Sequence, residues 1–347
     1  MSDASRPPGP RSLAGSVVLG LLAFAATLIL LFGLSSIISR TAGDAGATGR
    51  PTTTQQASTA SGRPSVSVTS SPTTTGSSSP SASSDPVLVG AGDIADCGLD
   101  SGAATAALLD SIDGTVFTAG DNAYPDGSAA NFKDCYDPTW GRHLERTRPA
   151  AGNHDWETRD LGGYLGYFGK RAAPAGASWY SYDLGRWHVI VLDSDCGFVG
   201  GCLPDTPQGR WLAADLDAST AGCTLAIWHH PRFSSGEHGN DTSVWPFWDA
   251  LYRAGADVVI NGHDHDYERF GPQDPAGRED KAAGIRQFVV GTGGAVLRRF
   301  PTVAAHSEKR ISDSLGVIRL VLHPTSYDWS FLDVGGAVGD SGNGDCH

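Results

Sequence analysis

Five short apolar segments limit the folds open to this chain more than any other feature of its sequence. They span residues 87–91, 116–119, 149–151, 225–228 and 258–260. Apolar runs of this length, bounded by glycine and polar residues, predict buried strands. Segments with helical spacing over 101–111, 207–217 and 245–254 lie between some of them. Because strand and helix signals alternate, we predict an α/β fold whose strands are largely parallel.

Two further pairs of segments predict β-hairpins. Residues 179–184 and 187–193 flank a turn at Gly185. Residues 316–322 and 327–334 flank a short His-Pro-Thr-Ser sequence and form the last predicted element. Glycine and proline between apolar runs are typical of the turns that join antiparallel strands.

Each of the five predicted strands is followed by a side chain that can bind a metal ion. These side chains are Asp93, Asp121, Asn153, His229 and the pair His263 and His265. Open α/β sheets gather their ligands at the carboxyl ends of the strands, so we expect these side chains to lie close together. A polar residue of this type after one strand would indicate only a turn. Residues of this type after all five predicted strands indicate a metal-binding site.

The residue types indicate a site for two metal ions. Two cations ~3.5–4 Å apart need oxygen and imidazole ligands, including a carboxylate that bridges both, and the predicted set provides them. His263 and His265 are one residue apart, so each imidazole can reach a different metal. The chain has no C-x-x-C pair, and a structural zinc site of the zinc-finger type is therefore not expected.

The motifs around these residues resemble those of the calcineurin-like metallophosphoesterase superfamily. They read GDIAD (92–96), GDNAY (120–124), GNHD (152–155), HHP (229–231) and GHDHDYER (262–269). The resemblance implies an α/β fold that is a four-layer αββα sandwich, in which two mixed β-sheets are flanked by helices. Most of the superfamily begins with Asp-x-His, whereas this chain has Asp93-Ile94-Ala95. Tyr124, three residues after Asp121, stands where the purple acid phosphatases have a phenolate ligand, so the chain is most similar to that subgroup.

The resemblance assigns the ligands to two metals. One metal would take Asp93, Asp121, Tyr124 and His265, and the other would take Asp121, Asn153, His229 and His263. A phenolate is a hard ligand that suits Fe³⁺, so we expect Fe³⁺ at the Tyr124 site and Zn²⁺, Mn²⁺ or Fe²⁺ at the other. The alternative for Tyr124 is an aromatic turn residue packed near Pro125, in which case the first metal can also be divalent.

Two histidines are predicted to contact the substrate rather than a metal. His154 matches a family histidine that touches the phosphate, where it would stabilise charge or protonate the leaving oxygen. His238 lies on a Gly- and Ser-rich loop on which the purple acid phosphatases have a substrate-facing histidine, and the alternative is a solvent-exposed loop residue. His230 is another candidate, but next to a ligand at a strand end we expect it to point away from the metals.

The resemblance therefore implies a metallophosphoesterase, an enzyme in which a metal-bound hydroxide attacks the phosphorus of a phosphate ester. We favour a phosphomonoesterase similar to the purple acid phosphatases, whose partner is a small-molecule phosphate ester. The alternatives are a phosphodiesterase acting on nucleotides or lipid headgroups, and a non-catalytic surface protein on the same scaffold. No nucleic-acid-binding module is expected, because the chain has a formal net charge of −13 and such binding depends on basic patches.

Several nearby residues have a structural interpretation. Tyr267, Glu268 and Arg269 either fix the two preceding histidines or form an ion pair that closes their loop. Asp193 and Asp195 are interpreted as solvated turn carboxylates. The Gly-Asp-Ser-Gly sequence at 339–342 resembles a serine protease motif by chance.

The first 86 residues are predicted to export and tether the rest of the chain. Residues 13–39 carry no charge and lie between Arg11 and Arg40, and a helix of this length can cross a ~30 Å hydrocarbon layer. We expect a short cytoplasmic segment (1–12), a transmembrane signal anchor (13–39), a disordered Ser/Thr/Pro-rich linker (40–86) and an extracytoplasmic catalytic domain (87–347). The chain would then be a single-pass protein of the cell membrane. Cleavage near Ala42 or Ala45 is the alternative and would make it a secreted protein.

The six cysteines are predicted to form three disulfides. An exported chain with an even number of cysteines favours disulfide bonds. The predicted pairs are Cys97–Cys135, Cys196–Cys202 and Cys223–Cys346. Free thiols in the core are the alternative and would suit a cytosolic protein.

Overall fold

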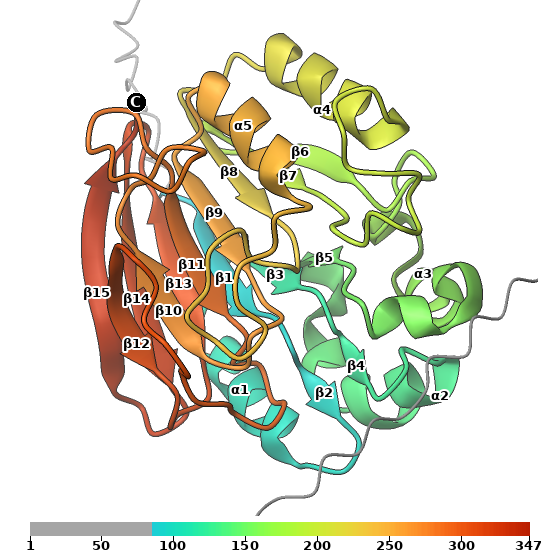
Figure 1. Ribbon diagram of the computed structural model, residues 1–347. Coiled ribbons are helices and arrows are strands. Elements are labelled where there is room, and N and C mark those ends of the chain that lie inside the picture. The colour runs from blue at the N-terminus through green and yellow to red at the C-terminus, as the bar shows by residue number, and fades with distance from the viewer. Residues whose placement is uncertain (1–84) are drawn as a thin grey trace, which may run out of the picture. The chain divides into compact units, whose positions relative to one another are not determined.

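Two β-sheets organise the structure, a computed structural model that describes residues 85–347 (Figure 1). The first sheet has six strands, in the spatial order β15 (Val338–Asp345), β14 (Ser326–Asp333), β13 (Gly316–Leu322), β1 (Val87–Ala91), β3 (Thr115–Ala119) and β5 (Thr147–Ala150). β1, β3 and β5 are parallel to one another, whereas β13, β14 and β15 pair in antiparallel fashion. This sheet is therefore mixed.

The second sheet has seven strands and is also mixed. Its order is β12 (Ser307–Ile311), β10 (Tyr267–Phe270), β11 (Arg286–Val290), β9 (Val258–Asn261), β8 (Cys223–Ile227), β7 (Trp187–Val191) and β6 (Tyr180–Leu184). The four central strands β7, β8, β9 and β11 are parallel, and the remaining three pair in antiparallel fashion. A separate short pair joins β2 (Ala95–Asp96) to β4 (Ala123–Tyr124).

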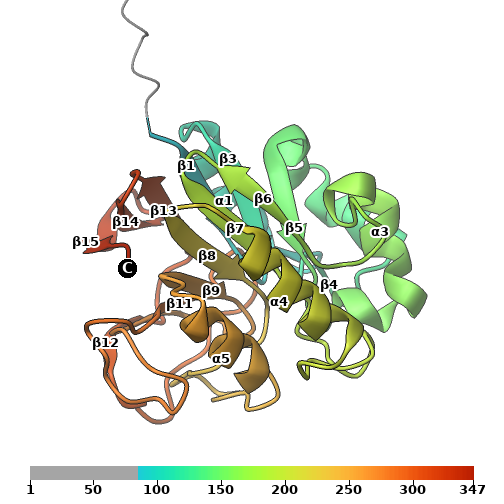
Figure 2. The same cartoon turned by 90° about the horizontal axis from the view of Figure 1, so that it is seen from above.

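Helices accompany both sheets. The α-helices of residues 85–347 are α1 (Ser101–Asp110), α2 (Ala129–Asn131), α3 (Gly162–Phe168), α4 (Pro207–Ala218) and α5 (Trp245–Arg253). α4 and α5 cover the outer face of the seven-stranded sheet (Figure 2), and α1 contacts β13 of the six-stranded sheet. α4 begins where the Thr206 side chain accepts a hydrogen bond from Gly209 N–H, with Pro207 at the first helical position, a favourable start for a helix.

The central strands β8 and β9 of the seven-stranded sheet are largely apolar on both faces because both faces are covered. Alternate residues of β8 belong to different clusters: Leu225 and Ile227 pack between the sheets, whereas Ala226 packs with α4 and α5. A strand covered on both faces has a continuous apolar sequence instead of an alternating one. This burial explains the uninterrupted apolar runs of the sequence, and the predicted fold class, two mixed sheets with helices, is confirmed.

The predicted strands, hairpins and helices are present. The strands β2, β4, β10, β11 and β12 were not predicted. The last strand, β15, was not predicted either. It contains the Gly-Asp-Ser-Gly sequence and extends the six-stranded sheet by pairing along β14. Its sequence, with three glycines and three acidic or amide residues among eight, has low β-propensity. Pairing with β14 therefore determines its conformation more than its own composition does.

The three predicted disulfides are confirmed. Cys97 is bonded to Cys135, Cys196 to Cys202 and Cys223 to Cys346. The last of these joins the first residue of β8 to the segment that follows β15. It therefore links the two sheets covalently.

The predicted segments at the start of the chain lie almost wholly outside the described residues. These are the cytoplasmic segment 1–12, the anchor 13–39 and the linker 40–86 except for its last two positions. Within residues 85–347, no helix combines the length and the apolar character needed to cross a membrane.

Candidate metal centre

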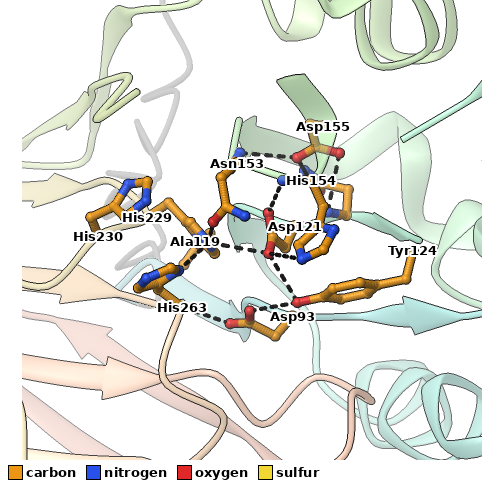
Figure 3. Close-up of polar contacts among 12 residues, drawn as sticks. Asp93, Ala119, Asp121, Tyr124, Asn153, His154, Asp155, His229, His230 and His263 are labelled. Carbon is orange, nitrogen blue, oxygen red and sulfur yellow. Dashed lines mark hydrogen bonds and ion pairs between the residues drawn. The ribbon is translucent and has the colours of Figure 1, made fainter. Parts of the chain in front are cut away.

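The carboxyl ends of parallel strands from both sheets meet at one place (Figure 3). Asp93 and Asp121 follow β1 and β3 of the six-stranded sheet, and His229 and His263 follow β8 and β9 of the seven-stranded sheet. Two hydrogen bonds connect these ends across the sheets. The backbone N–H of His263 donates to Asp93 Oδ2 at 2.8 Å, and His229 Nδ1 lies 2.8 Å from the carbonyl oxygen of Ala119.

A first group of side chains surrounds the hydroxyl of Tyr124. This hydroxyl lies 2.9 Å from Asp93 Oδ1, 2.9 Å from Asp121 Oδ2 and 3.1 Å from His265 Nε2. Tyr124 ends β4, which pairs with β2, and β2 begins two residues after Asp93, so the small sheet positions the phenol. The first predicted ligand set, from Asp93, Asp121, Tyr124 and His265, is thus assembled in space.

A second group surrounds Nε2 of His229. This nitrogen lies 3.3 Å from Asp121 Oδ2, 3.1 Å from Asn153 Oδ1 and 3.3 Å from His263 Nδ1. These four residues are the second predicted set. One atom, Asp121 Oδ2, belongs to both groups, so its carboxylate has the position expected of a bridge.

Close packing explains the glycine before several of these residues. A Cβ atom at Gly152 would lie 2.3 Å from Asp121 Oδ1, and one at Gly262 would lie 2.6 Å from Asp93 Oδ2. A side chain at either position would displace a carboxylate. Glycine therefore precedes the Asp, Asn and His residues because neighbouring strand ends lie too close together to leave room for a side chain.

The protein family follows from a comparison of the sequence. Residues 84–267, more than half of the chain, match the model of the calcineurin-like phosphoesterases. The chain belongs to this family. The predicted class of enzyme, a phosphoric ester hydrolase, is therefore confirmed at the level of the family.

The relatives of this phosphoesterase include purple acid phosphatases. Purple acid phosphatase 21 of Arabidopsis thaliana is 27% identical over 230 residues, which cover 58% of this chain and 51% of the relative. The chain thus spans about half the length of this curated relative. The solved structure of the purple acid phosphatase PPD1 from yellow lupin (Lupinus luteus) seeds superposes with a TM-score of 0.57 at 20% identity, over 75% of this chain and 54% of that chain.

A second solved structure shares the fold. GAP50, the anchor in the inner membrane complex of Plasmodium, superposes with a TM-score of 0.61 at 14% identity, over 76% of this chain and 90% of that chain. At such identities both solved structures show a common fold and nothing more about this phosphoesterase.

Two histidines of the site, His229 and His265, are oriented for binding through Nε2, whereas His263 faces the second group with its Nδ1. His229 Nδ1 faces the Ala119 carbonyl, and His265 Nδ1 lies 2.9 Å from the Val296 carbonyl. A carbonyl oxygen only accepts hydrogen bonds, so each Nδ1 carries a proton and each Nε2 remains for a ligand interaction. This orientation fits metal ions at the centres of the two groups.

Burial and the nearby carboxylates set the protonation of the metal-free centre. Burial raises the pKa of Tyr124 well above its ordinary value, and the Asp93 and Asp121 carboxylates raise it further. Burial acts to lower the pKa of His229, but the Asp121 and Asp93 carboxylates outweigh it and raise that pKa to about 10. The phenol and the imidazolium therefore keep their protons without metal, and cations that bind here would displace them.

The predicted substrate-contacting histidines lie at the border of the two groups. His154 donates its backbone N–H to Asp121 Oδ1 at 2.8 Å, its ring Nε2 lies 3.9 Å from Asp121 Oδ2, and its ring lies against Tyr124 at 4.5 Å between centroids. His238 is on an exposed loop, and its ring packs on that of His263 with centroids 4.2 Å apart. Both histidines thus lie near the predicted ligands.

His230 is also near the site, although its Nδ1 is bonded elsewhere. Its Nδ1 lies 2.8 Å from Ser194 Oγ, while its ring packs on His263 at 4.3 Å between centroids. The expectation that His230 points away agrees with the Ser194 bond but overlooks the contact with His263. Burial, followed by the charge of His229, lowers the pKa of His230 to about 4, so it is neutral at physiological pH.

Two carboxylates interpreted as solvated are in fact buried. Asp193 is fully buried and accepts hydrogen bonds from Ser178 Oγ and Trp156 Nε1, and Asp195 is 8% exposed. The interpretation was wrong because the strand β7 leads directly into them inside the fold. Burial raises the pKa of Asp195 to about 8, with a contribution from Asp193.

Sequence reasoning missed Arg298 at the border of the site. Its guanidinium is hydrogen-bonded to His238 Nε2, and its backbone N–H donates to the His265 carbonyl at 2.9 Å. No motif includes Arg298, so the sequence contained no signal for it.

The residues after the histidine pair have structural contacts. Tyr267 and Arg269 donate to Asp340 of β15 at 2.8 and 2.7 Å, and Glu268 accepts a 2.8 Å hydrogen bond from Ser235 N–H. Arg269 does form ion pairs, but with Asp340 of β15 and Glu308 of β12, so they join strands and do not close the histidine loop. Glu268 connects β10 to the loop of His238.

Proposed function

We propose that this protein is a phosphomonoesterase that works with two metal ions, as its similarity to purple acid phosphatases suggests. The observation that carries the proposal is the position of Asp121 Oδ2, 2.9 Å from the Tyr124 hydroxyl and 3.3 Å from His229 Nε2. A two-metal centre needs one carboxylate in common between two ligand sets. Asp121 is suitably placed for this role.

The proposed ligands divide as the two groups do. One metal would be held by Asp93, Asp121, Tyr124 and His265, and the other by Asp121, Asn153, His229 and His263. The phenol of Tyr124 favours Fe³⁺ at the first position, and the neutral Asn153 suits a divalent ion such as Zn²⁺, Mn²⁺ or Fe²⁺ at the second. Bound there, the ions would neutralise the phosphate oxygens and supply the hydroxide that attacks phosphorus.

The protein's own side chains would orient the ester and move a proton. His154, fixed by its backbone bond to Asp121, is proposed to hold the phosphate or to protonate the leaving oxygen. His238, whose ring packs on that of His263, is proposed to contact the same phosphate. The water oxygen bonds to phosphorus, the ester P–O bond breaks, and the alcohol leaves with a proton.

A direct experiment compares esters and counts metals. The full chain is purified, its iron, zinc and manganese are measured, and turnover of an aryl phosphate monoester is compared with that of the matching diester. We expect close to two metals per chain and faster monoester hydrolysis. Faster diester hydrolysis would favour the phosphodiesterase alternative, and no turnover by metal-loaded protein would favour a non-catalytic surface protein.

We further propose that residues 13–39 anchor the catalytic domain outside the cytoplasm, unless the segment is cleaved and the protein secreted. The three disulfides support an extracytoplasmic location, because such bonds persist in oxidising compartments. Fractionation of cells that produce the full chain, followed by protease treatment of intact cells, distinguishes membrane-bound from secreted protein. Protein found only in the cytoplasm would contradict both forms of the proposal.

A further inference from the structure

An aromatic pair lies beside the candidate metal centre. The rings of Trp156 and Phe198 stack with 4.9 Å between centroids and 10° between planes. Trp156 is three residues after Asn153, and its backbone N–H lies 3.3 and 3.2 Å from the carbonyl oxygens of Gly152 and Asn153. The pair is thus attached to the segment that contributes a predicted ligand and the adjacent His154.

Buried hydrogen bonds hold Trp156 in place. Its Nε1–H donates to both oxygens of Asp193 at 3.2 Å. Asp193 also accepts from Ser178 Oγ at 2.6 Å, and its backbone is bonded to the side chain of Gln208 at 2.8 and 2.9 Å. The indole therefore has a defined orientation before any ligand binds.

The loop of Phe198 is closed covalently and begins beside His230. The Cys196–Cys202 disulfide spans it, and the backbone N–H groups of Phe198 and Gly201 donate to the carbonyls of Asp195 and Cys196 at 2.8 and 2.9 Å. At its base, Ser194 Oγ accepts a 3.0 Å hydrogen bond from the backbone N–H of His230. The loop thus leaves β7 next to the strand end that carries His229.

Phe198 is exposed despite this rigid setting. Its side chain is 65% exposed, and one face of the ring is covered by Trp156. An aromatic ring held in the solvent by a closed loop presents a flat apolar surface on which another ring can stack. Ligand binding would remove this surface from water, which is favourable.

We propose that Phe198 and Trp156 bind the alcohol part of the phosphate ester and that this alcohol is aromatic. The inference rests on the proposed hydrolase function and names its substrate class, aryl phosphate monoesters. In such an ester the ring is joined to phosphorus through one oxygen. With the phosphate at the two groups of predicted ligands, the ring would stack on the pair, whose Trp156 is hydrogen-bonded to the Gly152-Asn153 segment. An aliphatic alcohol has no flat face to stack there.

The kinetic test compares two esters and three variants. Metal-loaded full chain is assayed with 2-naphthyl phosphate and with glycerol 3-phosphate, as wild type, Phe198→Ala and Phe198→Tyr. We expect Phe198→Ala to raise the KM for 2-naphthyl phosphate about tenfold, which corresponds to the loss of one aromatic stacking contact. The KM for glycerol 3-phosphate should not change. Phe198→Tyr keeps the ring and should restore the naphthyl KM. Leu203→Ala, at a 59% exposed position of the same region, is the control and should change neither.

A binding test without turnover separates this inference from the proposed function. Saturation-transfer NMR of 2-naphthyl phosphate is recorded with chelator-treated full chain and its Phe198→Ala variant. We expect transfer to the naphthyl protons in the wild type and its loss in the variant. Equal transfer in both proteins, or equal KM changes for both esters, would overturn the inference. If the wild type hydrolyses neither ester, the proposed function fails, and the binding result alone decides on the aromatic site.

Discussion

The backbone N–H of His263 donates a 2.8 Å hydrogen bond to Asp93 Oδ2, although the two residues are 170 positions apart in the chain. Asp93 follows a strand of one sheet, and His263 follows a strand of the other. Both residues have positive φ angles, 58° and 72°, a backbone conformation that costs energy for residues other than glycine. The closing of the two sheets on each other therefore maintains a strained backbone where the candidate site lies.

Replacement of Asp121 should abolish metal binding and activity together. Because its carboxylate belongs to both ligand groups, we expect Asp121→Ala to lose most bound metal and to lower kcat/KM for an aryl monoester about 100-fold or more. Metal analysis and steady-state kinetics measure the two effects. Asp134→Ala, at an exposed position, is the matched control. Unchanged metal content in Asp121→Ala would show that the ligands are assigned incorrectly.

Replacement of Tyr124 tests the trivalent metal. A tyrosinate bound to Fe³⁺ absorbs visible light, so the iron-loaded protein should be coloured, and Tyr124→Phe should lose the band. The hydroxyl is the part of Tyr124 that lies 2.9 Å from both carboxylates, and phenylalanine keeps the ring. Absorption spectra of the two proteins at equal iron content make the comparison. A band of equal strength in Tyr124→Phe would contradict a phenolate ligand.

Chelation should destabilise the folded protein. Without cations, the buried carboxylates of Asp93 and Asp121 lie close together, whereas bound metal at a hundred times its Kd stabilises the fold by about 2.7 kcal/mol. We expect the Tm to fall by about 5 °C or more on removal of metal and to recover when Zn²⁺ or Fe³⁺ is restored. Differential scanning fluorimetry with and without chelator provides the measurement, and an unchanged Tm would argue against a resident metal.

The charge of His188 should make stability depend on pH. The Asp215 carboxylate, bonded at 2.8 Å, raises the pKa of His188 against the effect of burial, and Asp183 raises it further. Because the folded pKa is the higher one, the stabilisation is complete below the unfolded value of ~6.5 and is lost as pH rises through the folded pKa. We expect His188→Gln to lower the free energy of unfolding by about 1–2 kcal/mol at pH 5.5 and by less at pH 9. Urea titrations of both proteins at the two pH values measure this difference. An equal loss of unfolding free energy at pH 5.5 and pH 9 would show that the charge of His188 is not involved.

The Cys223–Cys346 disulfide should matter more for stability than Cys196–Cys202. The first spans 123 positions and the second spans 6, and a longer loop loses more entropy in the unfolded chain when it is closed. We expect the double serine variant of the long pair to lose about 2–5 kcal/mol and that of the short pair to lose less. Denaturant unfolding of both variants provides the comparison, and the reverse order would contradict this account.

The sequence allowed the ligand groups to be predicted because their members occupy equivalent positions. Asp93, Asp121, Asn153 and His229 each follow a buried strand, and strands that run in parallel bring their ends to one edge. The two predicted hairpins were likewise accessible from their local turns. The even number of cysteines predicted disulfides, whereas the three pairs were one choice among the 15 that six cysteines allow.

Other parts of the site depend on contacts that have no periodicity in the sequence. Arg298 reaches His238 from a separate loop, and Phe198 meets Trp156 across two loops. The burial of Asp193 depends on Ser178 and Gln208, which come from distant segments. Such side chains become recognisable only when the surrounding elements have been placed.

The shared carboxylate of Asp121 has a consequence for how two ions would load. Each ion would alter the charge and orientation of a donor that the other also uses, so occupancy of one position must change the affinity of the other by a factor that is the same in both directions. The Asp121 side chain would then determine whether the first ion strengthens or weakens binding of the second ion, and by how much. Titration of metal-free protein with either ion alone, and then with both, would report this coupling as a difference between stepwise affinities.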